Sequence, residues 1–399
     1  MANLKDKVLK LGNRFTENSC ENLIWLINFF PRLAGFPLET DENNANKFSK
    51  KTTSLLFWIV HITLLLYIYI VGTTVYQMYY AEGFIDAINS FFNIYLFILI
   101  FITTWWMLQK RNDLNDLLVL VRENDRLVIE SGKFLGLHQK LMREIKIIVM
   151  LYYTFHFING LVIFIPSRIF GIDNYSTASC VGLEPLTTSP NRQICMAILA
   201  GQELTAMVTI GSYDSILLFL FAHTTSIFLI LYEEMQSFER IAVKYDGSPE
   251  MRISIRKCLQ NLIVRHSLVL RTVKMLQDIY FTSIGLGFGL DALSLCLFFV
   301  LPLDVCLNFA PLIYYCLLVF FLHCFQGQRL TTASEKFEMA VYCCGWEYLN
   351  VKEQKYILMM LKVAQEPVIL YAAGVIPIRI YTFASTMQSI YKFVTIFRV

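Results

Sequence analysis

The stretch FFNIYLFILIFITTWW, residues 91–106, contains no charged side chain, and neither does LLFWIVHITLLLYIY, residues 55–69. Both stretches continue into apolar segments of about 20 residues or more, the length of α-helix that crosses about 30 Å of hydrocarbon. The composition of the 399-residue chain agrees, since 56% of its residues are hydrophobic and 16% are charged. Soluble domains contain about 25% charged residues, so we predict a membrane protein rather than two soluble domains.

Apolar segments of this kind recur along the chain and predict an all-α membrane protein with seven transmembrane helices. The seven segments are Thr52–Tyr80, Phe84–Leu108, Ile145–Pro166, Ile194–Leu231, Ile279–Leu301, Phe309–Cys324 and Val368–Phe397. A shorter apolar stretch, Leu23–Ala34, follows the polar residues 1–22 and is interrupted by Asn28, Pro31 and Arg32. It is too short to cross a bilayer and predicts an interfacial or re-entrant helix, and we expect no cleavable signal peptide.

The basic residues lie almost entirely on one side of the seven segments. Eight Lys and Arg residues precede the first segment, and the connections 2–3, 4–5 and 6–7 contain eight, eight and five. The connections 1–2, 3–4 and 5–6 contain none, two and none. Because cytoplasmic loops carry the excess of Lys and Arg, we predict the N-terminus inside the cell and the C-terminus outside. This orientation is opposite to that of a G-protein-coupled receptor.

The predicted cytoplasmic connections carry apolar residues at helical spacing, as in Leu114, Leu117, Leu118 and Val121. Helices with apolar faces outside the bilayer must pack against one another or another subunit, or lie on the inner leaflet, and we favour a packed helical anchor. The predicted regions are residues 1–51, a cytoplasmic segment with a short interfacial helix; 52–232, helices 1–4 and the ligand-pocket bundle; 233–278, anchor extensions of helices 4 and 5; 279–324, helices 5 and 6; 325–367, the rest of the anchor; and 368–399, helix 7.

Motifs of enzymatic chemistry are absent from the sequence. The six histidines are scattered without the i, i+4 pair of a zinc-binding helix, and there is no phosphate-binding loop, nucleophile elbow or Cys-x-x-Cys. The net charge is only +3 and no arginine-rich stripe occurs. We therefore predict no catalytic residue, no cofactor, no metal site and no nucleic-acid partner, while membrane lipid is an expected partner.

Aromatic and small residues gather in the outer halves of predicted helices two, three, four and six. A cavity lined by them would suit a small, largely apolar ligand, although an interfacial aromatic belt is the alternative interpretation. The candidate lining residues are Phe92, Tyr95, Phe157, Gly160, Phe164, Met207, Val208, Gly211, Tyr314 and Tyr315. The carboxylates Glu203, Asp214 and Asp291 are interpreted as polar contacts between helices or as residues nearer the membrane interface.

The last predicted helix is unusually polar for a helix facing lipid. Its polar residues are Arg379, Thr382, Ser385, Thr386, Gln388, Ser389, Lys392 and Thr395, and the sequence then becomes apolar around Ile396. A polar helix with an apolar constriction at one end suits a pore with a gate, and the same pattern also suits a helix buried in protein.

Two features fall in the predicted outer 3–4 connection. Cys180 and Cys195 lie where oxidising conditions allow a disulfide, unless Cys195 already belongs to the fourth helix. The same connection contains the chain's one Asn-x-Ser/Thr acceptor for N-glycosylation, at Asn174.

Several short motifs resemble the insect odorant receptor family. They are Leu33-Ala34-Gly35-Phe36-Pro37, Trp346, the Lys352–Lys362 helix, Gln365-Glu366-Pro367, the apolar run into Gly374, Tyr381-Thr382-Phe383 and Ser389-Ile390-Tyr391-Lys392-Phe393. The last motif departs from the family pattern, in which Ser-Tyr is usual where Ile390-Tyr391 stands and a small residue where Lys392 stands. The chain is also short for the shared co-receptor, so it resembles a divergent, ligand-specific subunit.

The resemblance implies a tetrameric, ligand-gated cation channel in the plasma membrane of olfactory sensory neurons, completed by the odorant receptor co-receptor. Its ligand would be a small volatile organic compound bound among helices two, three, four and six. The resemblance further implies that residues 368–399 line the pore for cations, that Ile396 forms the apolar gate, and that Val399 stands near the outer mouth. Ser389 and Lys392 would then lie along the same water path.

Three alternatives stay open at this point. A gustatory-type channel would differ in its ligand class, although the Thr-Tyr and Gln-Phe ending usual in that family is absent. A metabotropic seven-helix receptor would need Asp-Arg-Tyr after helix three, Asn-Pro-x-x-Tyr in helix seven and the opposite orientation. A secondary transporter would need inverted repeats with paired broken helices, and we find none.

Overall fold

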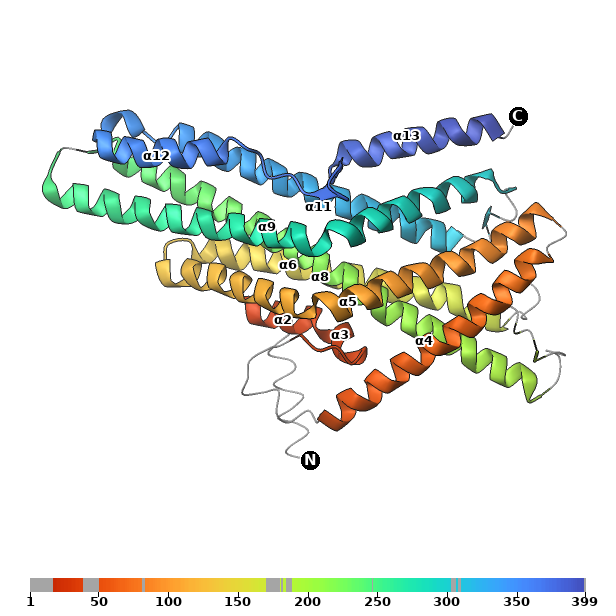
Figure 1. Ribbon diagram of the computed structural model, residues 1–399. Helices are drawn as coiled ribbons and strands as arrows, with labels where there is room; N and C mark the ends of the chain where they lie inside the picture. The colour runs from red at the N-terminus through yellow and green to blue at the C-terminus, as the bar shows by residue number, and fades with distance from the viewer. Residues whose placement is uncertain are drawn as a thin grey trace.

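The computed structural model describes residues 17–38, 50–80, 83–169, 180, 182–183, 189–245, 247–302, 306–307 and 310–397. In this part of the chain the protein is a bundle of long helices with one small β-hairpin, which confirms the predicted all-α class (Figure 1). The elements are α2 Cys20–Ile27, α3 Phe29–Leu33, α4 Lys50–Tyr79, α5 Phe84–Ser131, α6 Leu135–Ile169, α8 Asn191–Ala242, α9 Pro249–Val300, α11 Ala310–Tyr342, η1 Trp346–Tyr348, α12 Val351–Ala364, β1 Tyr371–Ala372, β2 Ile376–Pro377 and α13 Ile380–Phe397.

Three helices are too long to be contained in a bilayer. Helix α5 has 48 residues, and α8 and α9 have 52 each. At 1.5 Å per residue these lengths are about 70–80 Å, more than twice the thickness of the hydrocarbon core. Each helix therefore combines a membrane segment with an extension beyond the membrane. The apolar faces expected around Leu114–Val121 and on both sides of the 4–5 connection lie on these extensions.

Helix α8 forms the centre of the bundle, with α5, α6, α9 and α11 packed around it (Figure 1). Its residues 215–228 are buried on every side, including Phe219 and Phe221, which are 0% exposed. A helix that is apolar all round is stable only when other elements surround it completely. Among the described residues, α6, α8, α9 and α11 are long and apolar enough to cross a membrane by length and composition.

The N-terminal helices differ from the expected interfacial or re-entrant helix, because α2 is buried in the bundle. Leu23, Ile24 and Ile27 are at most 1% exposed and belong to the main hydrophobic core. Asn28, which interrupts the apolar stretch, exchanges two hydrogen bonds with the backbone of Leu38, at 2.8 and 2.9 Å. The polar residue closes a turn between two buried segments, so the apolar side chains are covered by protein.

The seventh predicted segment, Val368–Phe397, is also corrected, because α13 begins only at Ile380. The preceding residues form the β1–β2 hairpin, with Tyr371 opposite Pro377 and Ala372 opposite Ile376. Gly374 has φ +71° at its turn, a left-handed conformation that glycine adopts without a steric penalty. Pro377 and this turn prevent a helix from starting earlier, and they were visible in the sequence.

Hydrogen bonds from α9 to the backbone of the hairpin hold the hairpin in place. The Gln277 side chain binds both the N–H and the C=O of Tyr371, at 2.7 and 2.8 Å. The Ala373 N–H donates to the Phe281 carbonyl at 3.0 Å. These contacts fix the point from which α13 starts and therefore the direction in which it leaves the bundle.

Because His266 is buried, we expect the stability of the predicted anchor to depend on pH. The ring is 4% exposed, lies 4.7 Å from the Phe337 ring, and burial lowers the pKa of His266 to about 4. The unfolded chain takes up a proton near pH 6.5 while the folded chain does not. The buried neutral ring therefore makes its full contribution to the free energy of unfolding above pH 6.5. That free energy falls by roughly 3 kcal/mol as the pH decreases towards 4.

The His266→Phe variant keeps an aromatic ring against Phe337 and removes the titration. We expect its thermal unfolding in detergent to depend less on pH between 6.5 and 4 than that of the native chain. Melting temperatures at pH 7.5 and 4.5 measure the difference. An identical pH dependence in the two proteins would contradict the burial of a neutral imidazole.

Candidate functional site

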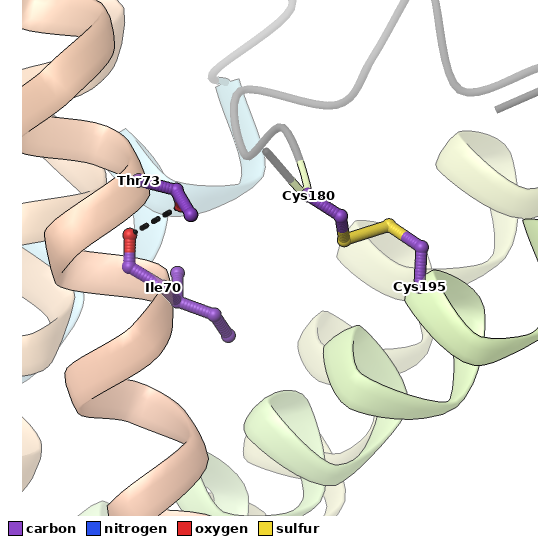
Figure 2. Close-up of a disulfide and its surroundings, with 4 residues drawn as sticks. All are labelled: Ile70, Thr73, Cys180 and Cys195. Atoms are coloured by element: carbon purple, nitrogen blue, oxygen red, sulfur yellow. Dashed lines mark hydrogen bonds between the residues drawn. A yellow bond between two sulfur atoms is a disulfide. The ribbon is translucent and has the colours of Figure 1, made fainter. Parts of the chain in front are cut away.

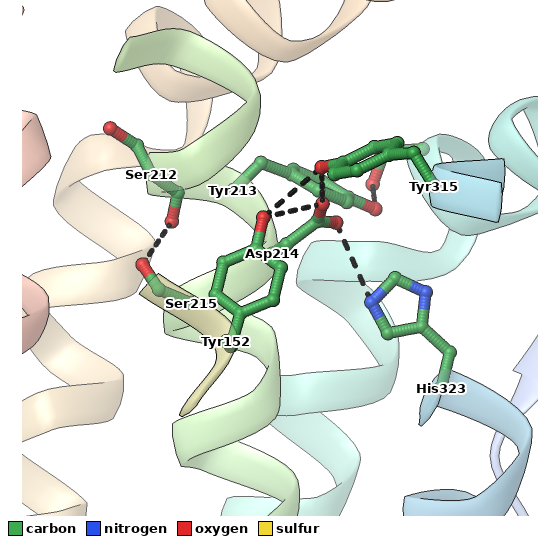
Figure 3. A network of polar contacts seen from close by, with 8 residues as sticks. Tyr152, Ser212, Tyr213, Asp214, Ser215, Tyr315 and His323 are labelled. Carbon is green, nitrogen blue, oxygen red and sulfur yellow. Dashed lines mark hydrogen bonds and ion pairs between the residues drawn. The ribbon is translucent and has the colours of Figure 1, made fainter. Parts of the chain in front are cut away.

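A buried polar network joins α6, α8 and α11 in the middle of the bundle (Figure 3). The hydroxyls of Tyr152 and Tyr315 each donate to Asp214 Oδ2 at 2.9 Å and lie 3.2 Å from each other. His323 Nε2 lies 3.5 Å from Asp214 Oδ1, too far for a well-formed hydrogen bond. Asp214 is 4% exposed, so these side chains replace the water that a carboxylate otherwise requires.

A second carboxylate joins α5, α9 and α11. The Tyr95 hydroxyl donates to Asp291 Oδ1 at 2.7 Å and lies 3.5 Å from Cys316 Sγ. Tyr213, next to Asp214 on α8, donates to Ser283 Oγ on α9 at 3.0 Å. For Asp214 and Asp291 the structure agrees with the interpretation as polar contacts between helices.

Four of the candidate pocket residues gather around His156 on α6. The His156 Nε2 atom is 2.8 Å from the Met207 carbonyl oxygen, and the His156 ring is 5.5 Å from the Tyr315 ring. A Cβ atom added to Gly211 would be 3.0 Å from His156 Nε2, and one added to Gly160 would be 2.7 Å from Met207 Sδ. Both glycines therefore stand where another helix approaches too closely for a larger side chain.

The other candidate pocket residues lie elsewhere in the structure or have side chains outside its described part. Tyr95 belongs to a neighbouring cluster with Phe298 and Ile390, and Val208 is 6% exposed in the main core. Phe157 and Tyr314 are 55% and 58% exposed on the outside of the single chain. The side chains of Phe92 and Phe164 lie outside the described part of the structure.

Sequence reasoning missed three polar members of this site, Tyr152, His156 and His323. Tyr152 and His156 are separated by four residues and their rings stack at 5.5 Å, so they lie on one face of α6. This spacing, together with Asp214 in an apolar segment, was the available signal. His323 offered none, because only the packing of α11 against α8 brings it near Asp214.

Between residues 389 and 396, helix α13 is covered on one side and uncovered on the rest of its surface. Ile390 and Val394 are 3% and 9% exposed and pack against the cluster formed mainly by α9 and α11. Ser389, Lys392 and Ile396 are exposed, and Ile396 is 71% exposed. Their spacing of three and four residues places them along one side of the helix. Val399 lies outside the described residues.

Cys180 and Cys195 form a disulfide at the start of α8 (Figure 2). Both residues pack in a small cluster with Leu199 of α8 and Ile70 of α4. The disulfide thus joins the connection before α8 to the end of the bundle where α4 and α8 meet. The candidate glycosylation site, Asn174, is outside the described residues.

Removing the carboxylate of Asp214 should destabilise the bundle. The Asp214→Ala variant leaves two buried phenol hydroxyls without their acceptor, which we expect to lower the free energy of unfolding by about 3 kcal/mol. Asp214→Asn is the matched control, because its amide oxygen still accepts a hydrogen bond and should cost less. Thermal challenge of the detergent-solubilised chain, followed by size-exclusion chromatography, measures both. Equal stability of Asp214→Ala and the native chain would contradict this description.

Comparison with known proteins identifies related sequences and structures. The profile of the family described as 7tm Odorant receptor matches residues 80–391. The structure of the insect olfactory receptor OR5 from Machilis hrabei in complex with eugenol superposes with a TM-score of 0.74 and 15% identity, covering 94% of this chain and 97% of that chain. A second structure of OR5 gives a TM-score of 0.74 and 15% identity over 93% and 96% of the two chains. At this identity the structural match shows a shared fold.

Proposed function

The chain belongs to the odorant receptor family, and from this membership we propose that it is the ligand-specific subunit of an odorant-gated cation channel. The family confirms that the chain is a receptor rather than an enzyme, and the fold is that of multi-pass membrane proteins. The proposed location is the plasma membrane of olfactory sensory neurons, with the N-terminus inside and the C-terminus outside. The observation that carries the channel proposal is the uncovered face of α13.

The proposed odorant pocket is centred on His156, between α6, α8 and α11. Gly160, Met207, Gly211 and Tyr315 gather there, and the OR5 structure in complex with eugenol supports a ligand site in this fold. Burying about 300 Å² of an apolar ligand contributes about 7 kcal/mol before the costs of binding. Micromolar affinity requires about 8 kcal/mol after those costs, so burial alone supports weak, shape-based recognition, to which one or two hydrogen bonds from a Tyr or Ser would add. Phe92, Tyr95, Phe157, Phe164, Val208 and Tyr314 remain proposed ligand-binding residues, although Tyr95, Phe157 and Tyr314 do not belong to the cluster around His156.

The proposed pore is lined by the exposed face of α13. Ser389 and Lys392 would face the water path and Ile396 would form the apolar gate, with Val399 towards the outer mouth. Rings of apolar side chains close pores by excluding water. Ligand binding near Tyr315 on α11 would act on the gate through the contact between α11 and α13.

The proposed assembly is a heterotetramer with the odorant receptor co-receptor. Apolar side chains of α12 remain uncovered in the single chain, including Leu358, Met359 and Val363, which are 65%, 68% and 50% exposed. Ile253 of α9, in the same predicted cytoplasmic region, is 68% exposed. Apolar surface of this kind outside a membrane is typical of protein interfaces and supports the anchor as the site of assembly.

A large side chain at Gly211 should abolish the odorant response. In Gly211→Trp the indole would have to displace His156, whose Nε2 lies only 3.0 Å from a Cβ atom placed there, so the odorant-evoked current per surface-labelled receptor should fall at least tenfold when the chain is co-expressed with the co-receptor. Gly72→Trp is the matched control, because a Cβ atom there meets nothing within 4 Å. Dose–response recordings and surface labelling measure both variants. An unchanged dose–response for Gly211→Trp would remove this residue from the pocket.

The lysine of α13 predicts poor conduction by the chain alone. Four copies of Lys392 around one axis would place four positive charges in the path of cations, whereas a heteromer contains fewer. We expect little odorant-evoked current without the co-receptor and a larger one from Lys392→Ser under the same conditions. Strong currents from the native chain expressed alone, equal to those of Lys392→Ser, would argue against this arrangement.

A further inference from the structure

Four buried polar side chains meet where α2 packs into the bundle. Cys20 begins α2, Asp125 lies on α5, His138 on α6 and His223 on α8, and their exposed fractions are 2%, 6%, 3% and 0%. The Cys20 Sγ, a carboxylate oxygen of Asp125 and a ring nitrogen of His223 all lie within 4.8 Å of one another. Cys20, Asp125 and His138 lie in segments predicted to be cytoplasmic, where thiols stay reduced, and His223 lies in the inner part of the fourth predicted transmembrane segment.

His223 is the second observation that points to a ligand. Neither of its ring nitrogens has a hydrogen-bond partner, although the side chain is completely buried. Buried polar groups normally have partners, and leaving one without a partner costs about 1–3 kcal/mol. A bound ion would supply the missing interaction at one of these nitrogens.

The donor set fits a transition-metal ion. Thiolate, imidazole and carboxylate are the three ligand types of protein zinc sites, with bonds of about 2.3 Å to sulfur and 2.0–2.2 Å to nitrogen or oxygen. Tetrahedral geometry with these bonds places the donor atoms about 3.6 Å apart, so atoms that lie within 4.8 Å of one another need to approach by at most about 1 Å. The thiolate and the carboxylate would also balance the charge of a divalent ion in this dry environment.

His138 is placed to orient the carboxylate. Its Nε2 atom lies 2.5 Å from Asp125 Oδ1, which leaves the other carboxylate oxygen for an ion. Hydrogen bonds from neighbouring residues to a metal ligand commonly fix its orientation and strengthen binding. Three protein donors leave the fourth position of a tetrahedral ion to a water molecule.

We propose that Cys20, Asp125 and His223 bind a zinc ion, with His138 as the positioning residue for Asp125. The ion would fasten the N-terminal helix α2 to α5 and α8, the latter of which also carries Gly211 of the proposed pocket. The site does not depend on the channel proposal. No sequence motif could reveal it, because its ligands come from three helices far apart along the chain.

The metal content of the purified full-length chain tests the proposal. Prepared without chelator, the native chain should contain one zinc ion that Cys20→Ser and His223→Gln lack. Cys258→Ser is the matched control, because this partly exposed cysteine lies on α9 outside the cluster. His138→Gln should still bind zinc, with an affinity about 10- to 100-fold lower.

Cobalt binding gives a second measurement, which does not depend on whether His223→Gln folds. The native chain and Cys258→Ser, loaded with Co²⁺, should show a thiolate-to-cobalt charge-transfer band that zinc displaces and that Cys20→Ser lacks. Substoichiometric zinc together with no such band in the native chain would overturn the proposal. So would zinc content and cobalt spectra unchanged by Cys20→Ser.

Discussion

The burial of the middle of α8 is the constraint on which the rest of the structure depends. Residues 215–228 of this 52-residue helix are buried on every side, so α5, α6, α9 and α11 must surround it there. The same helix therefore organises both the membrane part and the extension beyond it. Asp214 is the one carboxylate among the buried residues 211–228 of α8, and the hydroxyls of Tyr152 and Tyr315 fix how α6 and α11 pack there.

The helical character of the chain could be predicted because its physical causes are local. Uncharged runs such as residues 91–106 require a membrane, and the spacing of Leu114–Val121 requires a helix that continues beyond it. The start of α13 was predicted too early because hydrophobicity outweighed Gly374 and Pro377, although both residues favour a turn. The burial of α2 depended on α5, α6 and α8, which lie far away from it in sequence.

The candidate site was only partly predictable, because its residues also meet partners that lie far apart in sequence. Gly211, Met207 and Tyr315 could be selected by depth and by helix face, and the structure brings them to His156. The polar residues His323 and His223 gave no signal, since their surroundings are built by helices from distant parts of the sequence. Helix periodicity specifies which residues share a face, whereas only tertiary packing specifies what that face meets.

A comparison of Ile396 with Val394 tests most directly whether α13 lines the pore and emerges outside the cell. Ile396 is 71% exposed on the uncovered face of α13, and Val394, two residues earlier, is 9% exposed. With the chain expressed beside the co-receptor, a cationic, membrane-impermeant thiol reagent applied from outside should block the odorant-evoked current of Ile396→Cys and spare that of Val394→Cys. Block of neither variant from outside, or block of Ile396→Cys only from the cytoplasmic side, would contradict an outward-emerging α13 that lines the pore.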